Sequence, residues 1–529
     1  MLDAIRLINL RSFEDSDFIS LKPITILVGK NSSGKSTFLR TFPLLRQSVE
    51  SKTKGPILWY GSYVDFGAFS EAKSTLTSQD TISFEFSLNL PPHVLNQYSP
   101  LRNSLRRVKI ANDDIAANVK ISVTNNKGAT VFDSVEIEIE KRKIYIKYSG
   151  ADRCSVKITS ENGFEYVDSS LFYSSSNLIP PLFQKVREQF FIVGENNQPE
   201  TRTITKIVKL ESYNWLKNTA YTALKDYFYR TTRSETIVSG IQKLIITNDS
   251  SFFSNLVHTV YRDNQYFLTK HDVLKEKINS DLMDYVIALN INNVIDAINR
   301  VLINSFKNTR YIAPLRSTAE RYYRYQDLQV DEIDHTGSNL AMLLNSLTEA
   351  ERESFSTWTM KHFDFSVKAE ESGLHYAIKI KAKNSKLEYN INDMGFGYSQ
   401  ILPIITSIWL ETNNKKNNRM MMREITFAIE QPELHLHPEL QAKLAKLFVT
   451  TISVAKDNNI QLRFIFETHS KTMIDAVGEC VEVGHISQED VNVVIFDKAS
   501  IEDKTKVHVS YFDEDGFLVN WPIGFFSGN

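Results

Sequence analysis

A glycine-bounded segment near the N-terminus has the residue types and the spacing that bind phosphate groups. GKNSSGKST, from Gly29 to Thr37, fits the pattern G-x-x-x-x-G-K-[ST] between an apolar run and a helical pattern. Its glycines let the backbone wrap closely, so that N–H groups and a helix N-terminus face the phosphates. Lys35 would reach the β- and γ-phosphates, and Ser36 would ligate Mg²⁺. The predicted nucleotide-binding residues are Gly29, Lys30, Asn31, Ser32, Ser33, Gly34, Lys35, Ser36 and Thr37.

Two later segments, ITFAIEQPELHLHPE and FIFETHS, have groups that could complete a triphosphate site. The apolar run ITFAI ends in Glu430. An acidic residue at the end of a strand can bind Mg²⁺ or a water molecule on that ion. His469 follows the apolar run LRFIF, where an imidazole could sense the γ-phosphate. The sequence therefore predicts Ser36 and Glu430 as metal ligands and ATP with Mg²⁺ as the cofactors.

A third segment, INDMGFGYSQILP, predicts a second phosphate-binding helix N-terminus. Ser399 and Gln400 follow Gly395 and Gly397 and are expected to begin a helix with small residues and free N–H groups. One active site does not need two such helix ends. We therefore expect the second to contact nucleotide held by a partner subunit, as in ABC-type ATPases, where two copies enclose two ATP molecules head to tail. A homodimer or a higher oligomer follows from this prediction.

The elements that must position these groups are expected to form two halves of one α/β domain. Strands and helices alternate in residues 1–90, which hold the phosphate loop, and again in residues 306–529. Residues 91–305 between them read as an insertion without a catalytic signature or a repeat. Period-two alternation predicts β-hairpins over 91–178, and a 3.6-residue period predicts helices over 179–305. We expect this insertion to be an arm or a docking surface.

The order of the motifs resembles that of the SMC, RecF and OLD-type ABC ATPases. The resemblance is closer at YIAPLR (Tyr311 to Arg316), GFGYSQILP (Gly395 to Pro403), EQPELHLHP (Glu430 to Pro438) and the C-terminal WPIGFF. These segments look like the OLD-like ATPases of bacterial anti-phage defence operons, and most like the Septu ATPases (PtuA), including the form found beside retron reverse transcriptases. The resemblance covers roughly residues 1–90 and 306–529. It implies an ABC-type P-loop ATPase fold of the α/β class, split by the insertion.

The resemblance also implies roles for individual residues. Glu430 would be the Mg²⁺-side acid, the segment Gly395 to Gln400 a signature acting in trans, His435 to Pro438 a dimer-facing loop, and His469 the switch histidine. Gln431 departs from the pattern, because many ABC ATPases have there a second acid that acts as general base.

An amide cannot accept the proton, although it can orient water. Either Glu433 substitutes as the base, or hydrolysis is slow and the ATP-bound dimer is long-lived. The glutamine is expected to be natural, with an engineered trap as the alternative.

The Septu resemblance implies a nucleotide-gated switch that controls a partner HNH nuclease, and in a retron setting it adds a reverse transcriptase and its RNA-linked DNA. OLD proteins proper carry a Toprim nuclease domain after the ATPase. Only residues 471–529 follow the His loop here, so we expect no nuclease activity in this chain. The alternative is a DNA-repair ATPase of RecF or SMC type that binds DNA directly. A transporter motor fits poorly because of the long insertion and the form of the signature, GFGYSQ.

Composition narrows the class of protein further. Among 529 residues, 61 Lys and Arg against 63 Asp and Glu give a net charge of −2, which excludes a strongly basic nucleic-acid coat. Cys154 and Cys480 are the two cysteines, so a disulfide scaffold and a Cys-based zinc ribbon are excluded, and a reducing cytoplasm is expected. The most apolar stretch, Ile401 to Leu410, is about half of the roughly 20 residues that a membrane span needs. We expect a cytoplasmic chain without a membrane segment.

Four other groups of residues each have a functional and a structural interpretation. His435 and His437 could bind zinc, but the loop position explains them. Asp513, Glu514 and Asp515 resemble a nuclease cluster, yet they lie where a hairpin turn is expected. Arginines and aromatic residues interleave in RSTAERYYRY (Arg316 to Tyr325), as in a platform that stacks single-stranded nucleic acid, but its position next to YIAPLR favours a packed segment close to the ATPase site. A short basic run comprises Arg102, Arg106, Arg107 and Lys109. Its default interpretation is a solvent-exposed face.

Overall fold

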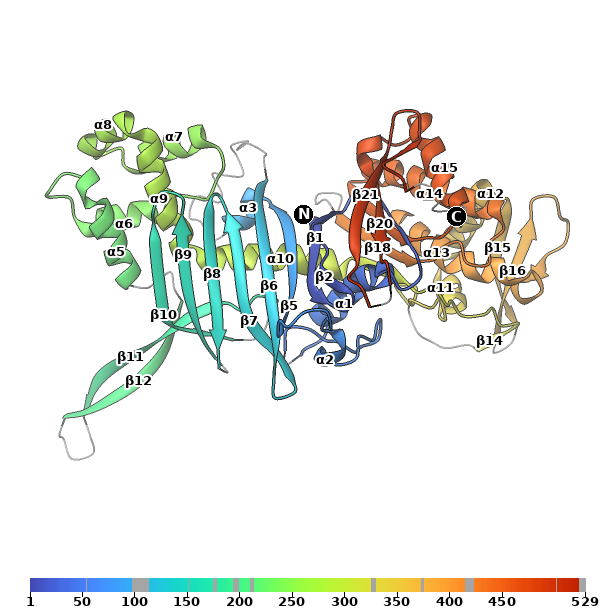
Figure 1. The fold of residues 1–529 in the computed structure, drawn as a ribbon, viewed down its shortest axis with the longest axis horizontal. Helices are drawn as coiled ribbons and strands as arrows, with labels where there is room; N and C mark the ends of the chain where they lie inside the picture. Colours follow the sequence, from blue (N-terminus) through green and yellow to red (C-terminus); the bar gives the residue numbers. More distant parts are fainter. Residues whose placement is uncertain are drawn as a thin grey trace. The chain divides into compact units, whose positions relative to one another are not determined.

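The computed structural model of the chain describes residues 1–53, 55–97, 114–150, 152–174, 178–193, 199–209, 214–324, 330–372, 375–413, 423–500 and 502–522. The chain forms two compact units. Unit 1 comprises Met1–Ile5, Lys52–Ile57 and Gln79–Ile303, and unit 2 comprises Arg6–Ser51, Leu58–Ser78 and Asn304–Asn529. Figure 1 labels their elements. The phosphate loop and all later motifs belong to unit 2.

A seven-stranded sheet forms the centre of unit 2. Its order is β13 (Thr309–Ile312), β18 (Arg423–Glu430), β19 (Ile460–Glu467), β4 (Ile24–Gly29), β20 (Val491–Asp497), β21 (Lys506–Phe512) and β22 (Leu518–Val519). The pairs from β13 to β20 are parallel, whereas β21 and β22 are antiparallel. The carboxyl ends of β4, β18 and β19 therefore share one edge, and Glu430 is the register partner of Glu467.

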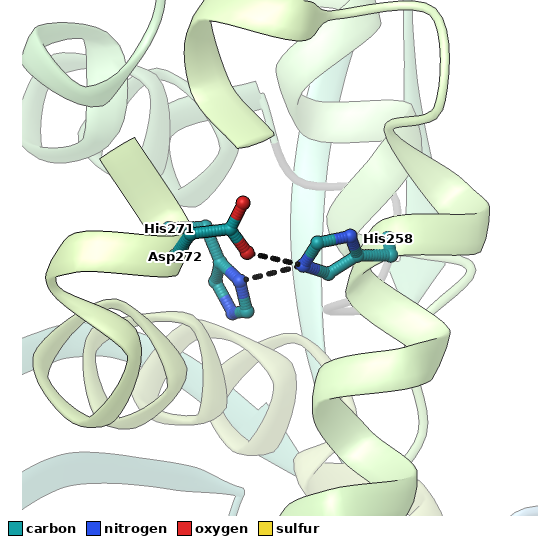
Figure 2. A group of neighbouring side chains, drawn as sticks. All are labelled: His258, His271 and Asp272. Atoms are coloured by element: carbon teal, nitrogen blue, oxygen red, sulfur yellow. Dashed lines mark hydrogen bonds and ion pairs between the residues drawn. The ribbon is translucent and has the colours of Figure 1, made fainter. Parts of the chain in front are cut away.

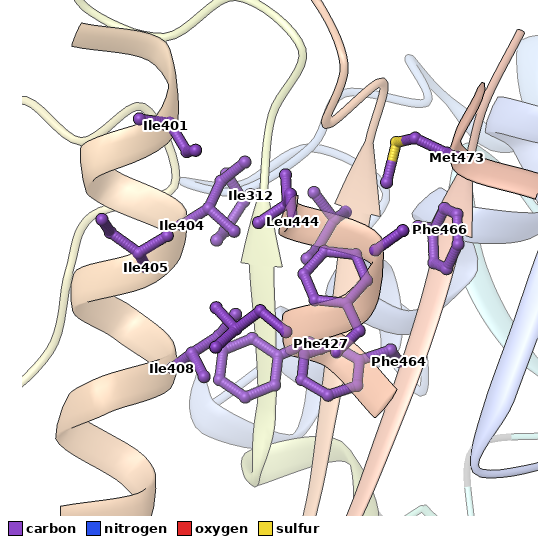
Figure 3. Close-up of a cluster of buried hydrophobic side chains, with 14 of the residues drawn as sticks. Ile312, Ile401, Ile404, Ile405, Ile408, Phe427, Leu444, Phe464, Phe466 and Met473 are labelled. Carbon is purple, nitrogen blue, oxygen red and sulfur yellow. The ribbon is translucent and has the colours of Figure 1, made fainter. Parts of the chain in front are cut away.

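Helices cover both faces of this sheet because its strands are apolar on both sides, as is usual for buried parallel strands. All six residues of β4 are buried. Helix α1 (Lys35–Glu50) packs on β13, β18 and β19. Helices α13 (Phe396–Asn413), α14 (Pro438–Asp457) and α15 (Lys471–Glu482) contribute to the main core. Figure 3 shows Ile404 and Ile408 of α13 directed toward Phe427 of β18 and Phe464 of β19.

Shorter elements complete unit 2. A small antiparallel sheet has the order β14 (Tyr323–Arg324), β16 (His375–Ala382) and β15 (Phe365–Ser372), and β17 (Tyr389–Asn390) pairs with β16. Helix α11 (Leu340–Ser346) and helix α12 (Glu349–Phe363) lie between β14 and β15 along the chain. Thr348 and Glu351 form a capping box at the start of α12. Near the N-terminus, β1 (Leu2–Leu10), whose residues up to Ile5 belong to unit 1, pairs with β2 (Phe13–Asp15) and β3 (Ile19–Ser20) and is also the neighbour of β5 (Thr81–Leu90) in the same sheet; α2 (Phe69–Ala72) follows.

Unit 1 combines an antiparallel sheet with helices. Consecutive strands are neighbours in the order β5 (Thr81–Leu90), β6 (Ile115–Asn126), β7 (Ala129–Ile139), β8 (Arg142–Ser149), β9 (Arg153–Ser160), β10 (Glu165–Tyr173), β11 (Leu182–Val193) and β12 (Pro199–Lys209). The helices are α3 (Pro92–Leu95), α5 (Asn214–Leu224), α6 (Ser234–Ile241), α7 (Ser250–Val260), α8 (Gln265–Val273), α9 (Lys275–Leu289) and α10 (Ile291–Lys307).

The prediction of helices over 179–305 is wrong for its first part. β11 and β12 pair antiparallel along their whole length, so the β-rich part continues to Lys209. The segment PETRTITKIVK in β12 is rich in Thr, Ile and Val, and such β-branched residues favour strands. The boundary between the units also does not lie at residue 90, where it was predicted. Strand β5 pairs with β6 over ten residue pairs and so belongs to unit 1.

Among the described residues, no single helix has the length and apolar character of a membrane span. The pair α9 and α10 meets that test only together, with a bend of 70° between the two helices.

Candidate functional site

The phosphate loop connects β4 to α1 through backbone that favours glycine. Gly29 has φ 154° and Gly34, the residue before α1, has φ 107°. A Cβ atom at Gly29 would lie 2.3 Å from the carbonyl oxygen of Phe496 in the neighbouring β20. The close approach of β20 therefore requires glycine at this position. The free N–H groups at the start of α1 face the concave side of the loop, where an anion would be stabilised.

Lys35 is buried within this loop. Its Nζ donates to the carbonyl oxygens of Gly29 at 2.9 Å and Lys30 at 2.8 Å, and it lies 3.6 Å from Oε1 of Glu467. Burial lowers the pKa of Lys35, and the Glu467 carboxylate opposes that shift. The ammonium group is thus held at the loop by groups that a phosphate could replace.

Glu467, the last residue of β19, is a site residue that the sequence analysis did not identify. The hydroxyl of Ser36 donates to its Oε2 at 2.6 Å. Glu467 is only 4% exposed, and burial raises the pKa of its carboxyl group. Ser36 and Glu430 were predicted to share a metal, and the hydroxyl of Ser36 contacts Glu467, the register partner of Glu430 on the adjacent strand.

Glu430 ends β18 as predicted, and it is bound by two residues from other elements. Arg40 of α1 donates two hydrogen bonds to its carboxylate, at 2.7 and 2.8 Å. The hydroxyl of Tyr311, from β13, donates to Oε1 at 2.7 Å. Burial raises the pKa of Tyr311, so its hydroxyl keeps its proton for Glu430. Together with Ser36 and Glu467, Glu430 forms a set of oxygen donors of the kind that Mg²⁺ prefers, so the residues present fit this ion.

The loop after β18 brings Gln431 and Glu433 to the same edge as His469. Gln431 has φ 42°, and its backbone N–H donates to the carbonyl oxygen of Glu467 at 3.0 Å. Oε1 of Glu433 accepts the backbone N–H of His469 at 2.8 Å. Burial raises the pKa of Glu433 and lowers that of His469. Glu433 is thereby moved toward the range of a general base, while the exposed His469 ring is neutral near pH 7.

The predicted signature begins its helix earlier than expected. Helix α13 starts at Phe396, directly after Gly395 with φ 83°. The free N–H groups of this helix therefore come from the residues before Ser399, which lies in the second turn. Ser399 is 6% exposed, and its hydroxyl donates to the carbonyl oxygen of Phe396 at 2.7 Å. Gln400, also buried, lies one residue further into the helix.

Arg316, the last residue of YIAPLR, connects the signature to the acidic strand. Its Nη2 donates to the carbonyl oxygens of Glu430 at 2.9 Å and Gln431 at 3.3 Å, and its own carbonyl oxygen accepts from Gln400 at 3.5 Å. Within the described part of the chain, its Nε and Nη1 have no hydrogen-bond partner. Burial lowers the pKa of Arg316 to about 10, which still leaves the guanidinium charged near neutral pH.

A pocket of about 690 Å³ lies next to the phosphate loop. Its lining includes Arg11, Ser12 and Phe66, and the Arg11 guanidinium stands 4.2 Å from the centroid of the Phe66 ring. Thr505 joins the pocket to the loop, because its hydroxyl lies 2.9 Å from that of Ser12 and donates to the carbonyl oxygen of Ser33 at 2.8 Å. The pocket offers a cation and a polar rim at a place where the base and ribose of a nucleotide could continue from the phosphates.

Other predicted groups have structural partners. The ring of His435 packs on Phe396, with centroids 5.4 Å apart, and Nδ1 of His437 accepts the backbone N–H of Glu439 at the start of α14. Asp513 lies in the turn between β21 and β22, as the hairpin interpretation predicts, and its carboxylate accepts the N–H of Phe517.

In RSTAERYYRY, Arg316 is buried and Tyr323 packs against the main core, whereas Arg321, Tyr322 and Arg324 are exposed, so the predicted packing holds only at particular positions. Tyr325, the basic run at Arg102 to Lys109, and residues 523–526 of WPIGFF lie outside the described residues.

A family of AAA ATPase domains (AAA_15) matches residues 1–474, about nine-tenths of the chain. The chain belongs to this family. Over an alignment of 309 residues, which covers 53% of the chain, the sequence is 23% identical to endonuclease GajA of Bacillus cereus (strain HuB5-5). The alignment covers 41% of that protein, so the chain spans less than half the length of this relative.

Two solved structures are similar at low scores. The SMC head domain from Thermotoga maritima is 9% identical with a TM-score of 0.32, covering 97% of this chain and 99% of that one. The recombination mediator protein RecF of the RecFOR pathway is 9% identical with a TM-score of 0.26, covering 96% of this chain and 98% of that one. The matched family and the order of strands around β4 identify the fold as an ABC-type P-loop ATPase of the α/β class.

Proposed function

We propose that the chain binds ATP with Mg²⁺ at the edge formed by β4, β18 and β19, hydrolyses it slowly, and uses it to close a dimer. One observation carries the proposal. Ser36 donates to Glu467 at 2.6 Å beside the buried Lys35, while Glu430 ends the adjacent strand. A lysine, a hydroxyl and two carboxylates at the mouth of a phosphate loop are the groups that a magnesium nucleotide requires.

Each residue has a role that follows from its contacts. Lys35 would exchange the two loop carbonyls for phosphate oxygens, and Ser36 with Glu430 and Glu467 would hold the metal or its water. Bound Mg²⁺ would neutralise charge on the phosphate oxygens. Gln431 would orient the attacking water, and Glu433 would accept its proton. The base and ribose would occupy the pocket beside Phe66.

The dimer proposal rests on the exposed start of α13. Phe396 is 54% exposed and makes an edge-to-face contact with the exposed ring of His435, so an aromatic surface flanks the signature. Gly397 lets the loop of His435 approach this turn closely, because a Cβ there would lie only 3.2 Å from the carbonyl oxygen of His435. Arg316 would transmit the nucleotide state, because its guanidinium donates to the backbone of Glu430 and its carbonyl oxygen accepts from the side-chain amide of Gln400. ATP would stabilise the closed dimer because its γ-phosphate would contact both subunits.

The proposed biological role is control of an effector in anti-phage defence. The support is the resemblance of the motifs to OLD-like and Septu ATPases, together with the partial match to endonuclease GajA. We propose that the effector is a partner HNH nuclease and that a reverse transcriptase with its RNA-linked DNA joins in a retron setting. Both cysteines are buried free thiols, which suits the reducing cytoplasm proposed as the location.

ATP hydrolysis by the purified chain tests the site. The expected result is slow turnover that requires Mg²⁺ and is abolished in Lys35→Ala, while Gln431→Glu is unchanged or faster. Lys456→Ala, which removes an exposed lysine of α14, is the matched control and should retain the wild-type rate. Turnover that survives Lys35→Ala would refute the assignment of the loop.

Molar mass measured by light scattering tests the switch. The wild type is expected to hydrolyse ATP slowly, so adding ATP should double its measured molar mass. Phe396→Glu should prevent the doubling without abolishing ATP binding, whereas Val483→Glu, at another exposed apolar residue of unit 2, should not. An unchanged wild-type mass would contradict the dimer.

Co-purification with a small HNH protein from a neighbouring gene tests the partner. ATPase activity that is instead stimulated by DNA, with a steep dependence on salt, would favour the RecF-like or SMC-like alternative.

A further inference from the structure

Three metal-ligating side chains converge in the helical part of unit 1, far along the sequence from the nucleotide site. They are His258 of α7 with His271 and Asp272 of α8 (Figure 2). Nε2 of His258 lies 3.2 Å from Nδ1 of His271 and 3.2 Å from Oδ1 of Asp272. The ligand atoms of the three residues all lie within 4.8 Å of one another.

A chain of hydrogen bonds determines which nitrogen of His271 is free to bind. The hydroxyl of Ser254 donates to the carbonyl oxygen of Ser250 at 2.9 Å, so its oxygen accepts from Nδ2 of Asn279 at 2.8 Å. Oδ1 of Asn279 must then accept the proton on Nε2 of His271, at 2.8 Å. In the neutral ring, Nδ1 of His271 therefore carries a lone pair, and this lone pair faces His258.

Hydrogen bonding alone leaves this arrangement incompletely satisfied. A single proton on Nε2 of His258 can serve only one of its two acceptors well, the Nδ1 of His271 or the carboxylate of Asp272. One cation placed between them would be bound by all three groups. In a tetrahedral zinc site with bonds of about 2.0–2.1 Å, neighbouring ligand atoms are about 3.3 Å apart. The two observed separations of 3.2 Å agree with that spacing.

We propose that His258, His271 and Asp272 bind a Zn²⁺ ion that fastens α8 to α7, with a fourth position open to water. Two imidazole nitrogens and one carboxylate favour zinc over Mg²⁺ or Ca²⁺, which prefer oxygen ligands. Asn279 orients His271 from behind, as the outer partners of metal-bound histidines usually do. The ion has a path of entry, because the His258 and Asp272 side chains are 41% and 64% exposed. The site is independent of the ATPase proposal.

Zinc titration of the full chain, purified without a histidine tag and freed of metal with a chelator, tests this site. Binding is measured by competition with a chromogenic zinc chelator. We expect saturable binding of one zinc per chain, and binding at least 100-fold weaker in His258→Ala and Asp272→Asn. His93→Ala removes another exposed histidine of unit 1 and should bind as the wild type does. Lack of stoichiometric binding by the wild type, or equal binding by the ligand variants, would overturn the proposal.

Two further measurements separate coordination from a purely structural role of these side chains. Zinc should raise the melting temperature of the wild type, and this increase should be absent in His258→Ala. Cobalt(II) in place of zinc should give the intense visible absorption of a tetrahedral site in the wild type. Absence of that band together with an unchanged melting temperature would overturn the proposal even if the variants fold normally.

Discussion

Replacing Glu467 by glutamine changes the charge of the candidate site with little change in shape. The amide oxygen can still accept the hydroxyl of Ser36, which now donates to the carboxylate at 2.6 Å. What disappears is the negative charge 3.6 Å from Nζ of Lys35. We expect Glu467→Gln to bind ATP more tightly than the wild type when Mg²⁺ is absent.

The magnitude follows from the burial and separation of the two groups. The side chains of Lys35 and Glu467 are 3% and 5% exposed, so screening by solvent is small. At an effective dielectric constant of about 20, opposite unit charges at this distance attract by about 4–5 kcal/mol. ATP must overcome this attraction to engage Lys35, and its phosphates are also repelled by the carboxylate. If one third of the attraction is recovered, about 1.4 kcal/mol, the dissociation constant falls tenfold.

Isothermal titration calorimetry with ATP, in EDTA and in excess Mg²⁺, measures the effect. The quantity compared is the dissociation constant in EDTA divided by the dissociation constant in excess Mg²⁺. The ratio should be at least tenfold smaller in Glu467→Gln than in the wild type, because the variant gains affinity without metal. Glu489→Gln removes an exposed carboxylate of the same unit and should keep the wild-type ratio. Equal ratios in all three proteins would refute the reasoning that Glu467 competes with ATP for Lys35.

Three other properties can be predicted from the site and from unit 1. Burial raises the pKa of Glu433 above the ordinary value of 4.5, so its base form is lost as the pH falls through that raised value. The kcat of the wild type should decline over the same pH range. Glu433→Gln should lack this acid limb in a pH–rate profile. Tyr311→Phe removes a buried hydrogen bond to a carboxylate, and urea unfolding should show a loss of about 1.5–3 kcal/mol. Arg142→Met leaves Asp284, 2.7 Å away and buried, without its guanidinium; the expected loss is about 3–5 kcal/mol by the same measurement, largely restored when Asp284→Leu is added.

The sequence predicted those parts of the site that depend on local pattern. The phosphate loop between β4 and α1, and the acid that ends β18, follow from apolar runs next to glycine or to a charged residue. Glu467 ends the run FIFE in the same way, yet the prediction passed over it for His469. Only the sheet order, with β19 between β4 and β18, places this carboxylate beside Lys35. That order is a long-range property that strand patterns do not contain.

The remaining partners were missed for the same physical reason. Arg40 binds a carboxylate 390 residues further along the chain, and Tyr311 binds the same group across 119 residues. YIAPLR pointed to Tyr311 and Arg316 as a motif, but no spacing indicates which buried acid or carbonyl they contact. The error over β11 and β12 was local instead, because their β-branched residues were visible in the sequence and a helical period was assigned across them.

The contacts of the site imply that nucleotide binding is an exchange of partners. Without ligand, Lys35 is held by carbonyls and Glu467, and Glu430 by Arg40 and Tyr311. A phosphate or metal that engages these groups would compete with their present partners, and this competition takes place at the ends of β18 and β19. Arg316 donates to the backbone of Glu430 and accepts from Gln400, and two of its buried nitrogens lack a partner among the described residues. A small shift at the end of β18 would thus reach the signature helix through the side chain of Arg316 and the contact of its carbonyl oxygen with the Gln400 amide, which gives the chain a physical route from ATP binding to a change at α13.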